Sequence, residues 1–369
     1  MATRREFLSR TGLALLGTAG TCFALPGDGR DVREGLEAVP DGSASRGMIT
    51  PATDLAIDRG LAYLNARSNR EGYFGTAGYM GNVAVTSLAA MAFMAAGNTP
   101  DRGPYGQLVT NSLKFVLGQE NRDNTHPGYL HNPHGTPHGP MYGHGFATLF
   151  LAEAYGMVHD RALREEVADK LHKAVQLILR SQNLEGGWRY TPDSRDADLS
   201  VTICQIMALR AARNAGLFVP RSKVDKCVEY VKACQDRSGY FRYMKMQSGG
   251  GGQGFARTAA GICALYSAGI YRGLEIDRGL RFLSNSRPTF VGVKPDMHYY
   301  YGHYYAVQAM WIAGGNHWRQ WYPAIRDDLL NRRRNDGSWQ SGLMCSNYCT
   351  AMALIILQVP NNYLPILQR

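Results

Sequence analysis

The sequence predicts an all-α protein, an α/α toroid of six helix hairpins with six outer and six inner helices. The first observation is a pattern of helix, turn and helix that recurs at intervals of about 50 residues, as in repeat architectures. The second is that the first helix of each unit has one apolar stripe, whereas the second is apolar on all sides and must be enclosed. The third is an excess of glycine, 42 of 369 residues, against a usual share of about 7%.

The N-terminal segment, residues 1–24, has the pattern of a twin-arginine export signal. Arg4 and Arg5 are followed by Phe7 and Leu8, and then by an apolar stretch that is too short to span a bilayer. The sequence therefore predicts a signal peptide over 1–24, a flexible linker over 25–50 and a toroid over 51–369. We expect export to the periplasm or the extracellular space, in a soluble or membrane-peripheral form, with the six cysteines beyond the signal peptide as buried free thiols.

The outer helices are predicted where charged and apolar residues alternate with a helical period. They are expected at AIDRGLAYL (56–64), NSLKFVLGQ (111–119), KAVQLILRSQ (173–182), KCVEYVKACQ (226–235), RGLRFLSNS (278–286) and AIRDDLLNR (324–332). Glycine-containing turns follow five of them, in REGYFG, HPGYLH, EGGWRY, RSGYFRY and NDGSWQ, and the remaining turn is irregular. The turn glycines are at positions 72, 128, 186, 187, 239 and 337.

The inner helices are predicted where small and apolar residues surround the helix. They are expected at 85–97, 147–156, 201–216, 257–269, 305–315 and 349–359. A threonine holds the same register in five of them, at positions 86, 148, 202, 258 and 350, and Ala306 replaces it in the sixth. Glycines that end these helices, at 97, 156, 216, 269 and 314, suit left-handed C-caps. Neither end shows a clear polar cap, so we expect a closed ring rather than an open solenoid.

Composition excludes several classes of protein. With 45% hydrophobic and 19% charged residues, the chain is neither disordered nor a polytopic membrane protein. The formal charge of +10 suits an anionic partner but is also common on inert surfaces. We expect no nucleic-acid partner.

Two segments resemble the repeat of the prenyltransferase and squalene-cyclase family. They are SQNLEGGWRYTPDSRDADLSVT (181–202) and NDGSWQ (335–340), and the resemblance extends over residues 52–369. It implies the terpenoid-cyclase-like toroid, which terpene cyclases, protein prenyltransferase β-subunits and thioester domains share. GPMYGHGFATLFLAEAYG (139–156) and the ending YLPILQR look more narrowly like exported bacterial members of unassigned activity.

The same resemblance implies a candidate acid. DADLSVT (196–202) is similar to the D-x-D-D-T segment of class II terpene cyclases, which implies Asp198 as general acid and Asp196 as supporting carboxylate. Leu199 stands in place of the family's next aspartate. An aspartate directly before a helix is also an ordinary N-cap, so that role stays open. Class II cyclases usually enclose their substrate between two α-barrel domains, whereas this chain has residues for one.

The inner helices should converge with their N-termini on one mouth of the ring, so polar and aromatic side chains there are candidates to line a cavity. These are His144, His303, Asn82, Glu153, Gln205, Tyr304 and Trp188. Core packing is the alternative for the aromatic residues. For Glu153, the alternative is a buried ion pair with Arg210 or Arg257.

No metal or other cofactor is expected. The zinc ligands of protein prenyltransferases are missing, because Tyr301, His303 and Ser346 stand at the matching positions, and thioester domains need a C-G-E-Q string that does not occur. The histidine-rich segment 126–144 lacks the spacing of a zinc motif.

Three functions remain open. A cyclase or isoprenoid-binding protein, with an isoprenoid or another apolar small molecule as ligand, predicts an aromatic-lined cavity. A non-catalytic scaffold for a cell-envelope protein predicts a filled centre and tolerance of Asp198→Asn. A lyase or hydrolase of acidic polysaccharides needs two opposed carboxyl groups or an arginine and a base.

Overall fold

The computed structural model describes residues 45, 47–120, 125–246, 254–286, 298–342 and 344–368. The chain divides into two compact units, Met1–Leu36 and Glu37–Arg369, and all described residues belong to the second. The predicted signal peptide and nearly all of the predicted linker lie outside the described residues. No helix among those described is both long and apolar enough to cross a membrane.

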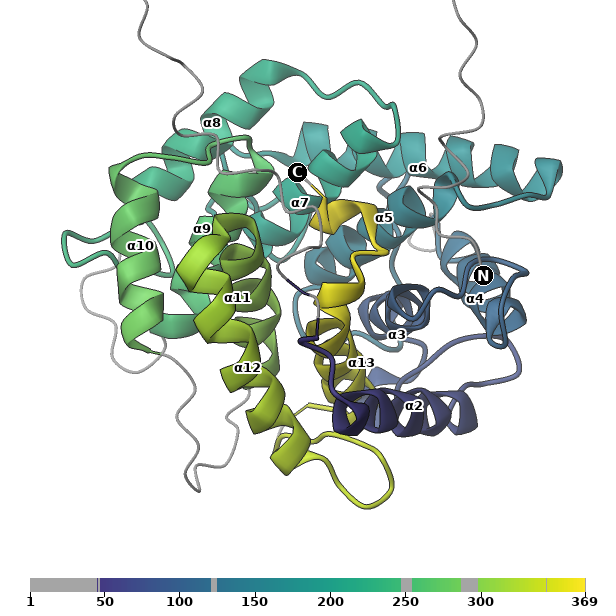
Figure 1. Ribbon diagram of the computed structural model, residues 1–369. Helices are drawn as coiled ribbons and strands as arrows, with labels where there is room; N and C mark the ends of the chain where they lie inside the picture. Colours follow the sequence, from purple (N-terminus) through teal and green to yellow (C-terminus); the bar gives the residue numbers. More distant parts are fainter. Residues whose placement is uncertain are drawn as a thin grey trace, which may run out of the picture. The chain divides into compact units, whose positions relative to one another are not determined.

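Outer and inner helices alternate along the chain (Figure 1), which confirms the predicted fold class. The outer helices are α2 (Pro51–Ala66), α4 (Gly106–Leu117), α6 (Arg161–Ser181), α8 (Arg221–Ala233), α10 (Leu274–Asn285) and α12 (Gly315–Arg332). The inner helices are α3 (Val83–Ala95), α5 (Pro140–Tyr155), α7 (Leu199–Asn214), α9 (Gly254–Ser267), α11 (Tyr299–Ala313) and α13 (Ser346–Gln358). Short 3₁₀ turns are η2 (Ala77–Tyr79), η3 (Val359–Asn361) and η4 (Pro365–Leu367), and the described part of the chain contains no β-strand.

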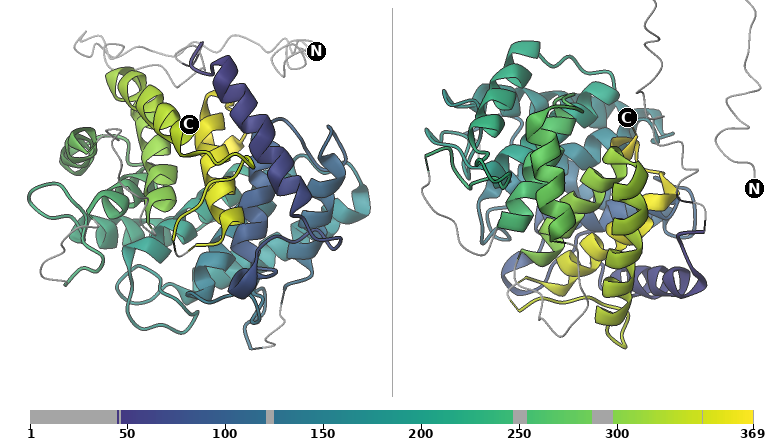
Figure 2. Two further views of the ribbon diagram at one scale, coloured as in Figure 1. Left: turned by 90° about the horizontal axis from the view of Figure 1, so that it is seen from below. Right: turned by 60° about the vertical axis from the view of Figure 1, so that its left-hand side comes forward.

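The inner helices form a closed ring. Each packs against the next along the chain, and α13 packs against α3. In Figure 2 the last inner helix, α13, lies beside the first outer helix, α2, and the two are in contact. The prediction of a closed ring rather than an open solenoid is confirmed.

The turn glycines join neighbouring repeats. Five of them are left-handed, with φ of 84° to 98°, and a Cβ on each would lie 2.3–2.6 Å from backbone of the next outer helix; they are Gly72, Gly128, Gly186, Gly239 and Gly337. Gly337 contacts Arg59 of α2, so the last turn closes the outer layer onto the first helix. Any side chain at these positions would collide with backbone, which explains why the repeat keeps glycine there.

The register threonines hold these turns to the inner helices. In four repeats the hydroxyl accepts a hydrogen bond from the amide two residues after the turn glycine. The donor and acceptor pairs are Phe74 and Thr86 (3.1 Å), Trp188 and Thr202 (3.1 Å), Phe241 and Thr258 (3.1 Å), and Trp339 and Thr350 (3.0 Å). The recurring threonine is therefore a structural residue that satisfies a buried turn amide.

Two local predictions need correction. Gly156 ends α5 with φ of −71°, so it is not a left-handed cap. Helix α12 starts at Gly315 and continues through Pro323, well before the predicted start at 324, because Trp318 and Trp321 are buried against the ring.

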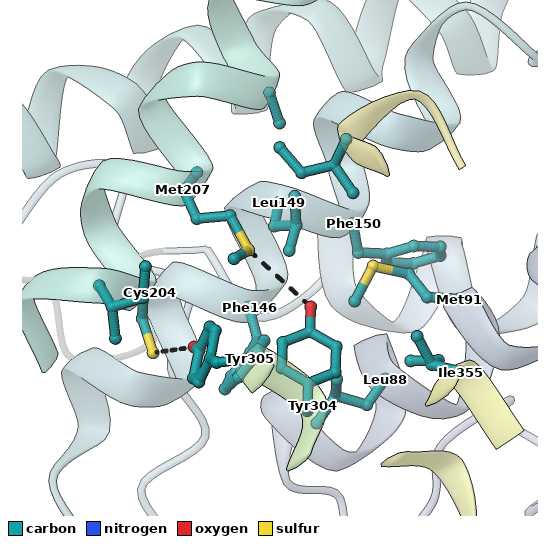
Figure 3. Packing of buried hydrophobic residues seen from close by; sticks show 14 of the residues in the cluster. Leu88, Met91, Phe146, Leu149, Phe150, Cys204, Met207, Tyr304, Tyr305 and Ile355 are labelled. Atoms are coloured by element: carbon teal, nitrogen blue, oxygen red, sulfur yellow. Dashed lines mark hydrogen bonds between the residues drawn. The ribbon is translucent and has the colours of Figure 1, made fainter. Parts of the chain in front are cut away.

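Side chains from the inner helices fill the centre of the ring (Figure 3). Those drawn and labelled are at most 4% exposed: Leu88, Met91, Phe146, Leu149, Phe150, Cys204, Met207, Tyr304, Tyr305 and Ile355. The six described cysteines are free thiols, and all but Cys345 are buried. At this level the ring is a packed hydrophobic core.

The C-terminal segment covers the end of the ring to which the inner-helix C-termini point. Ile366 and Leu367 in η4 are buried, and η4 packs against α7 and α11. The Trp311 indole donates to the Leu367 carbonyl at 2.9 Å, and Arg210 donates to the Gln368 carbonyl at 2.7 Å. The opposite end, at the N-termini of the inner helices, is the mouth.

Candidate functional site

Asp198 is buried at the mouth, where it caps α7. Its Oδ1 accepts a hydrogen bond from the Val201 amide at 2.9 Å, and its backbone amide donates to the Trp188 carbonyl at 3.0 Å. The side chain is fully buried, and Oδ2 has no hydrogen-bond partner among the described residues. One oxygen therefore performs the predicted capping role, and the Tyr243 hydroxyl also interacts with this carboxyl.

The environment of Asp198 favours the protonated carboxyl. Burial raises the pKa of Asp198 from its usual 3.8 to about 6, although the Val201 amide, Arg189 and the Tyr243 hydroxyl act in the opposite direction. A carboxyl of this kind holds a proton in mildly acidic solution and can transfer it near neutral pH. Its geometry and its pKa suit a general acid.

Tyrosines surround this carboxyl. The Tyr190 and Tyr243 hydroxyls share a hydrogen bond, and the Tyr301 hydroxyl donates to the Ser200 carbonyl at 2.8 Å. The charge of Asp198 adds to burial in raising the pKa of Tyr142, Tyr243 and Tyr301, so these phenols interact electrostatically with the carboxyl. We call Asp198, Tyr142, Tyr190, Tyr243 and Tyr301 the mouth cluster. Tyr142 and Tyr301 are partly exposed, whereas Asp198 is fully buried.

The sequence predicted Asp198, but it did not single out Tyr142, Tyr190 or Tyr243. Tyr142 is in the first turn of α5, and Tyr190 and Tyr243 are in the turns before α7 and α9. Tyr190 and Tyr243 each come four residues after a turn glycine, at Gly186 and Gly239. That shared offset is the signal that could have identified them.

Asp196 lies apart from the buried carboxyl. It is exposed, and it forms an ion pair with Arg189. Arg189 lies over the Tyr190 ring at 5.1 Å and favours the ionised form of Asp198 through its charge. Arg189 therefore interacts with both carboxylates.

His144 is a fully buried structural residue of α5. Its Nδ1 accepts a hydrogen bond from the Leu130 amide at 3.2 Å, and its Nε2 pairs with the Ala174 carbonyl at 3.2 Å, which requires the Nε2–H tautomer. Leu130 follows Gly128 by two residues, so this imidazole replaces the register threonine as acceptor for the turn amide. Burial lowers the pKa of His144 to about 3, so the ring stays neutral.

The His144→Ala substitution is expected to destabilise the fold by about 3 kcal/mol, because it creates a cavity and leaves the buried Leu130 amide unpaired. Chemical denaturation of the purified protein measures this loss. His134→Ala, which changes an exposed histidine of the loop before α5, should stay within about 0.5 kcal/mol of the wild type. Equal stability of the two variants would contradict the structural role of His144.

His303 lies between inner and outer helices. Its ring is 4.7 Å from Phe255 of α9, 4.5 Å from Tyr299 and 6.1 Å from Trp321 of α12. Burial lowers the pKa of His303 to about 3, and Nδ1 has no hydrogen-bond partner among the described residues. His303 is therefore a neutral imidazole packed among aromatic side chains.

The remaining predicted cavity residues are buried and bonded within the fold. Asn82 caps α3 by accepting from the Val85 amide at 3.0 Å, and it donates to the Gly135 carbonyl at 2.7 Å. Gln205 donates to the Met141 carbonyl at 2.8 Å, and the Trp188 indole donates to the Ile178 carbonyl at 2.8 Å. Tyr304 lies in the packed centre, where its hydroxyl is 3.8 Å from the Met207 sulfur.

Glu153 binds the C-terminal segment. Its Oε2 accepts a hydrogen bond from the Ile366 amide at 3.0 Å, and the side chain is 2% exposed. Burial raises the pKa of Glu153 from 4.5 to about 8, although the Ile366 amide and the charge of Arg210 lower it. The folded protein therefore holds this proton more tightly than the unfolded chain does.

The Glu153→Gln variant should not lose stability at high pH as the wild type does. In the wild type, stability is expected to fall as pH rises from 4.5 towards 8, by at most about 1.4 kcal/mol per pH unit for one proton. Glutamine keeps an acceptor for the Ile366 amide without a charge, so the variant should be the more stable protein at pH 9. Thermal unfolding at pH 6 and pH 9 measures the difference, and Glu165→Gln, on the exposed face of α6, is the control. Identical pH profiles for wild type and Glu153→Gln would contradict this prediction.

The described residues contain no group of three His, Cys, Asp or Glu side chains placed to hold a metal ion. The comparisons with known proteins concern the fold. No protein-family model matches the sequence, and a search of curated proteins finds no match.

The fold is similar to α/α toroids with different activities. The type II terpene cyclase MstE from Scytonema superposes with a TM-score of 0.54 at 14% identity, over 85% of this chain and 100% of that chain. An inactive variant of the α-1,6-mannanase GH76A of Salegentibacter sp. gives a TM-score of 0.57 at 8% identity, over 84% and 99% of the two chains. Cellobiose 2-epimerase from Bacillus thermoamylovorans gives 0.58 at 13% identity, over 82% and 95%.

At these identities the likeness shows the fold alone. Variants of MstE have also been solved with geranylgeranyl dihydroxybenzoate as substrate and with merosterolic acid A as product. The chain is an α/α toroid whose fold resembles a type II terpene cyclase as well as carbohydrate-active enzymes.

Proposed function

We propose that this protein binds an isoprenoid or a similar apolar alkene at its mouth and protonates it with Asp198. The observation that carries the proposal is the fully buried carboxyl of Asp198, which has a raised pKa and only one oxygen occupied by helix capping. Similarity in fold to a type II terpene cyclase supports it. Asp196 is assigned a supporting role through Arg189.

The chemistry requires only groups of the mouth cluster. The proton of Asp198 would pass to one alkene carbon, the π electrons would form the new C–H bond, and positive charge would develop on the other carbon. The faces of Tyr142 and Tyr301 suit stabilisation of that charge through cation–π attraction. Attack by a second alkene would form a C–C bond and move the positive charge to another carbon. Loss of a proton to water would then give the neutral product, and Asp198 would regain a proton from solvent.

The packed centre limits where such a ligand binds. Phe146, Tyr304 and Tyr305 fill the ring below the mouth (Figure 3), so the ligand is assigned to the level of the mouth cluster. To test this, we would incubate the purified protein with geranylgeranyl dihydroxybenzoate, squalene and polyprenyl diphosphates. The expected result is a product detected by mass spectrometry or saturable binding, and the absence of both would overturn the proposal.

A non-catalytic scaffold that binds an envelope protein is the second candidate, and the packed centre favours it. It differs from the first in tolerating Asp198→Asn. A polysaccharide lyase or hydrolase has less support, because Asp196 is exposed and paired with Arg189 rather than opposed to Asp198.

We also propose export of the protein through the twin-arginine route, from the pattern around Arg4 and Arg5. Fractionation of cells that express the full chain should find it outside the cytoplasm. A variant with both arginines changed to lysine should remain inside. Equal export of both forms would contradict the proposal.

A further inference from the structure

A basic pocket lies on the outer layer of the ring, away from the packed centre. It has a volume of about 470 Å³, within the usual size of a small-molecule site. It is formed between the turn that follows α8 and helix α10, and its lining residues are Arg237, Ser238, Arg278, Arg281, Phe282, Asn285 and Ser286.

Three arginines make this pocket positively charged. The guanidinium groups of Arg237, Arg278 and Arg281 form no hydrogen bond or ion pair with any side chain or backbone group that the structure describes, and no acidic residue lines the pocket. The nearby Asp236 accepts a hydrogen bond from the Ser238 amide at 2.9 Å within the turn. Gathered like charges repel each other, and a bound anion would relieve that repulsion.

The repeat architecture does not require these arginines. Each turn glycine contacts one residue of the next outer helix, which defines equivalent positions between repeats: Gly72 contacts Asn111, and Gly239 contacts Arg278. The trios equivalent to Arg237, Arg278 and Arg281 are Arg70, Asn111 and Lys114; His126, Lys173 and Gln176; Leu184, Lys226 and Glu229; and Asn335, Arg59 and Ala62. Among these repeats, three arginines coincide at this place alone, so they serve a local purpose.

We infer that this pocket binds a ligand bearing a tetrahedral oxyanion, a phosphate or sulfate ester. Guanidinium groups donate paired hydrogen bonds that match the oxygens of such an anion, and three of them suit a group with more than one negative charge. The Asn285 amide can add a neutral donor. Phe282 gives the pocket an apolar wall for the rest of the ligand.

Calorimetric titration of the intact protein tests this inference, with inorganic pyrophosphate in one arm and a sulfated disaccharide in the other. We expect saturable binding in at least one arm, and the tighter arm identifies the source of the anion. Arg278→Ala and Arg281→Ala should each weaken that binding by about tenfold or more, the usual loss for one charge-assisted hydrogen-bonding group.

The matched control is Lys114→Ala. It removes one positive charge at the position of the first repeat that is equivalent to Arg281, and it should leave the affinity unchanged. Thermal unfolding should show that all three variants are folded, since each change lies on an outer helix away from the buried stripe. Lack of saturable binding in both arms, or equal weakening by Lys114→Ala, would overturn the inference. Loss of alkene turnover with normal anion binding would leave it standing.

Discussion

Replacement of Asp198 by asparagine is expected to lower alkene turnover by at least about 100-fold, the usual contribution of a general acid, with little change in stability. Asparagine caps helices about as well as aspartate does, and its carbonyl oxygen can still accept from the Val201 amide. What it lacks is the acidic proton. Product formation by mass spectrometry and thermal unfolding together separate the two effects.

The control for this variant is Asp160→Asn, because Asp160 caps α6 through the Leu163 amide at 2.7 Å. The same substitution in the same capping role should leave turnover unchanged.

In the wild type, the rate should fall as pH rises through about 6, because Asp198 then loses the proton that it must donate. Full turnover by Asp198→Asn would show that this carboxyl is not the acid, and would favour the scaffold function.

Gly337→Ala is expected to destabilise the protein by about 2–4 kcal/mol, the combined effect of left-handed strain and overpacking. Gly337 has φ of +87°, and a Cβ there would lie 2.6 Å from the Arg59 carbonyl oxygen. The neighbouring atoms are backbone of α2, which cannot move aside as a side chain would. Because this contact joins the last repeat to the first, the substitution tests closure of the ring.

Gly216→Ala is the control for this prediction. Gly216 has φ of +95°, but nothing lies within 4 Å of its added Cβ, so only the conformational strain of about 1 kcal/mol is expected. Denaturant titration of both variants gives the free energies of unfolding. Equal losses at the two positions would contradict the close contact between Gly337 and Arg59.

The sequence alone was sufficient to predict the alternation of outer and inner helices, the turns and the closed ring. These features depend on local patterns that six repeats reinforce: apolar stripes, glycines with positive φ such as Gly72, and threonines such as Thr86 that accept from turn amides. Helix limits were less accurate where packing overrides local preference. Pro323 lies within α12 because the surrounding tryptophans are buried.

Only the tertiary structure decided what the polar residues do. Asp196 and Asp198 are only two positions apart, yet Asp196 is exposed and Asp198 is fully buried. The reason is that Asp196 lies in the turn, whereas Asp198 caps the first turn of the buried inner helix α7. His144 replaces a threonine as acceptor for the turn amide. The arginines of the basic pocket come from segments about 40 residues apart, which is close to one repeat length. Burial and hydrogen bonding depend on neighbours distant in sequence, so a repeat pattern fixes the positions of side chains but not their electrostatic surroundings.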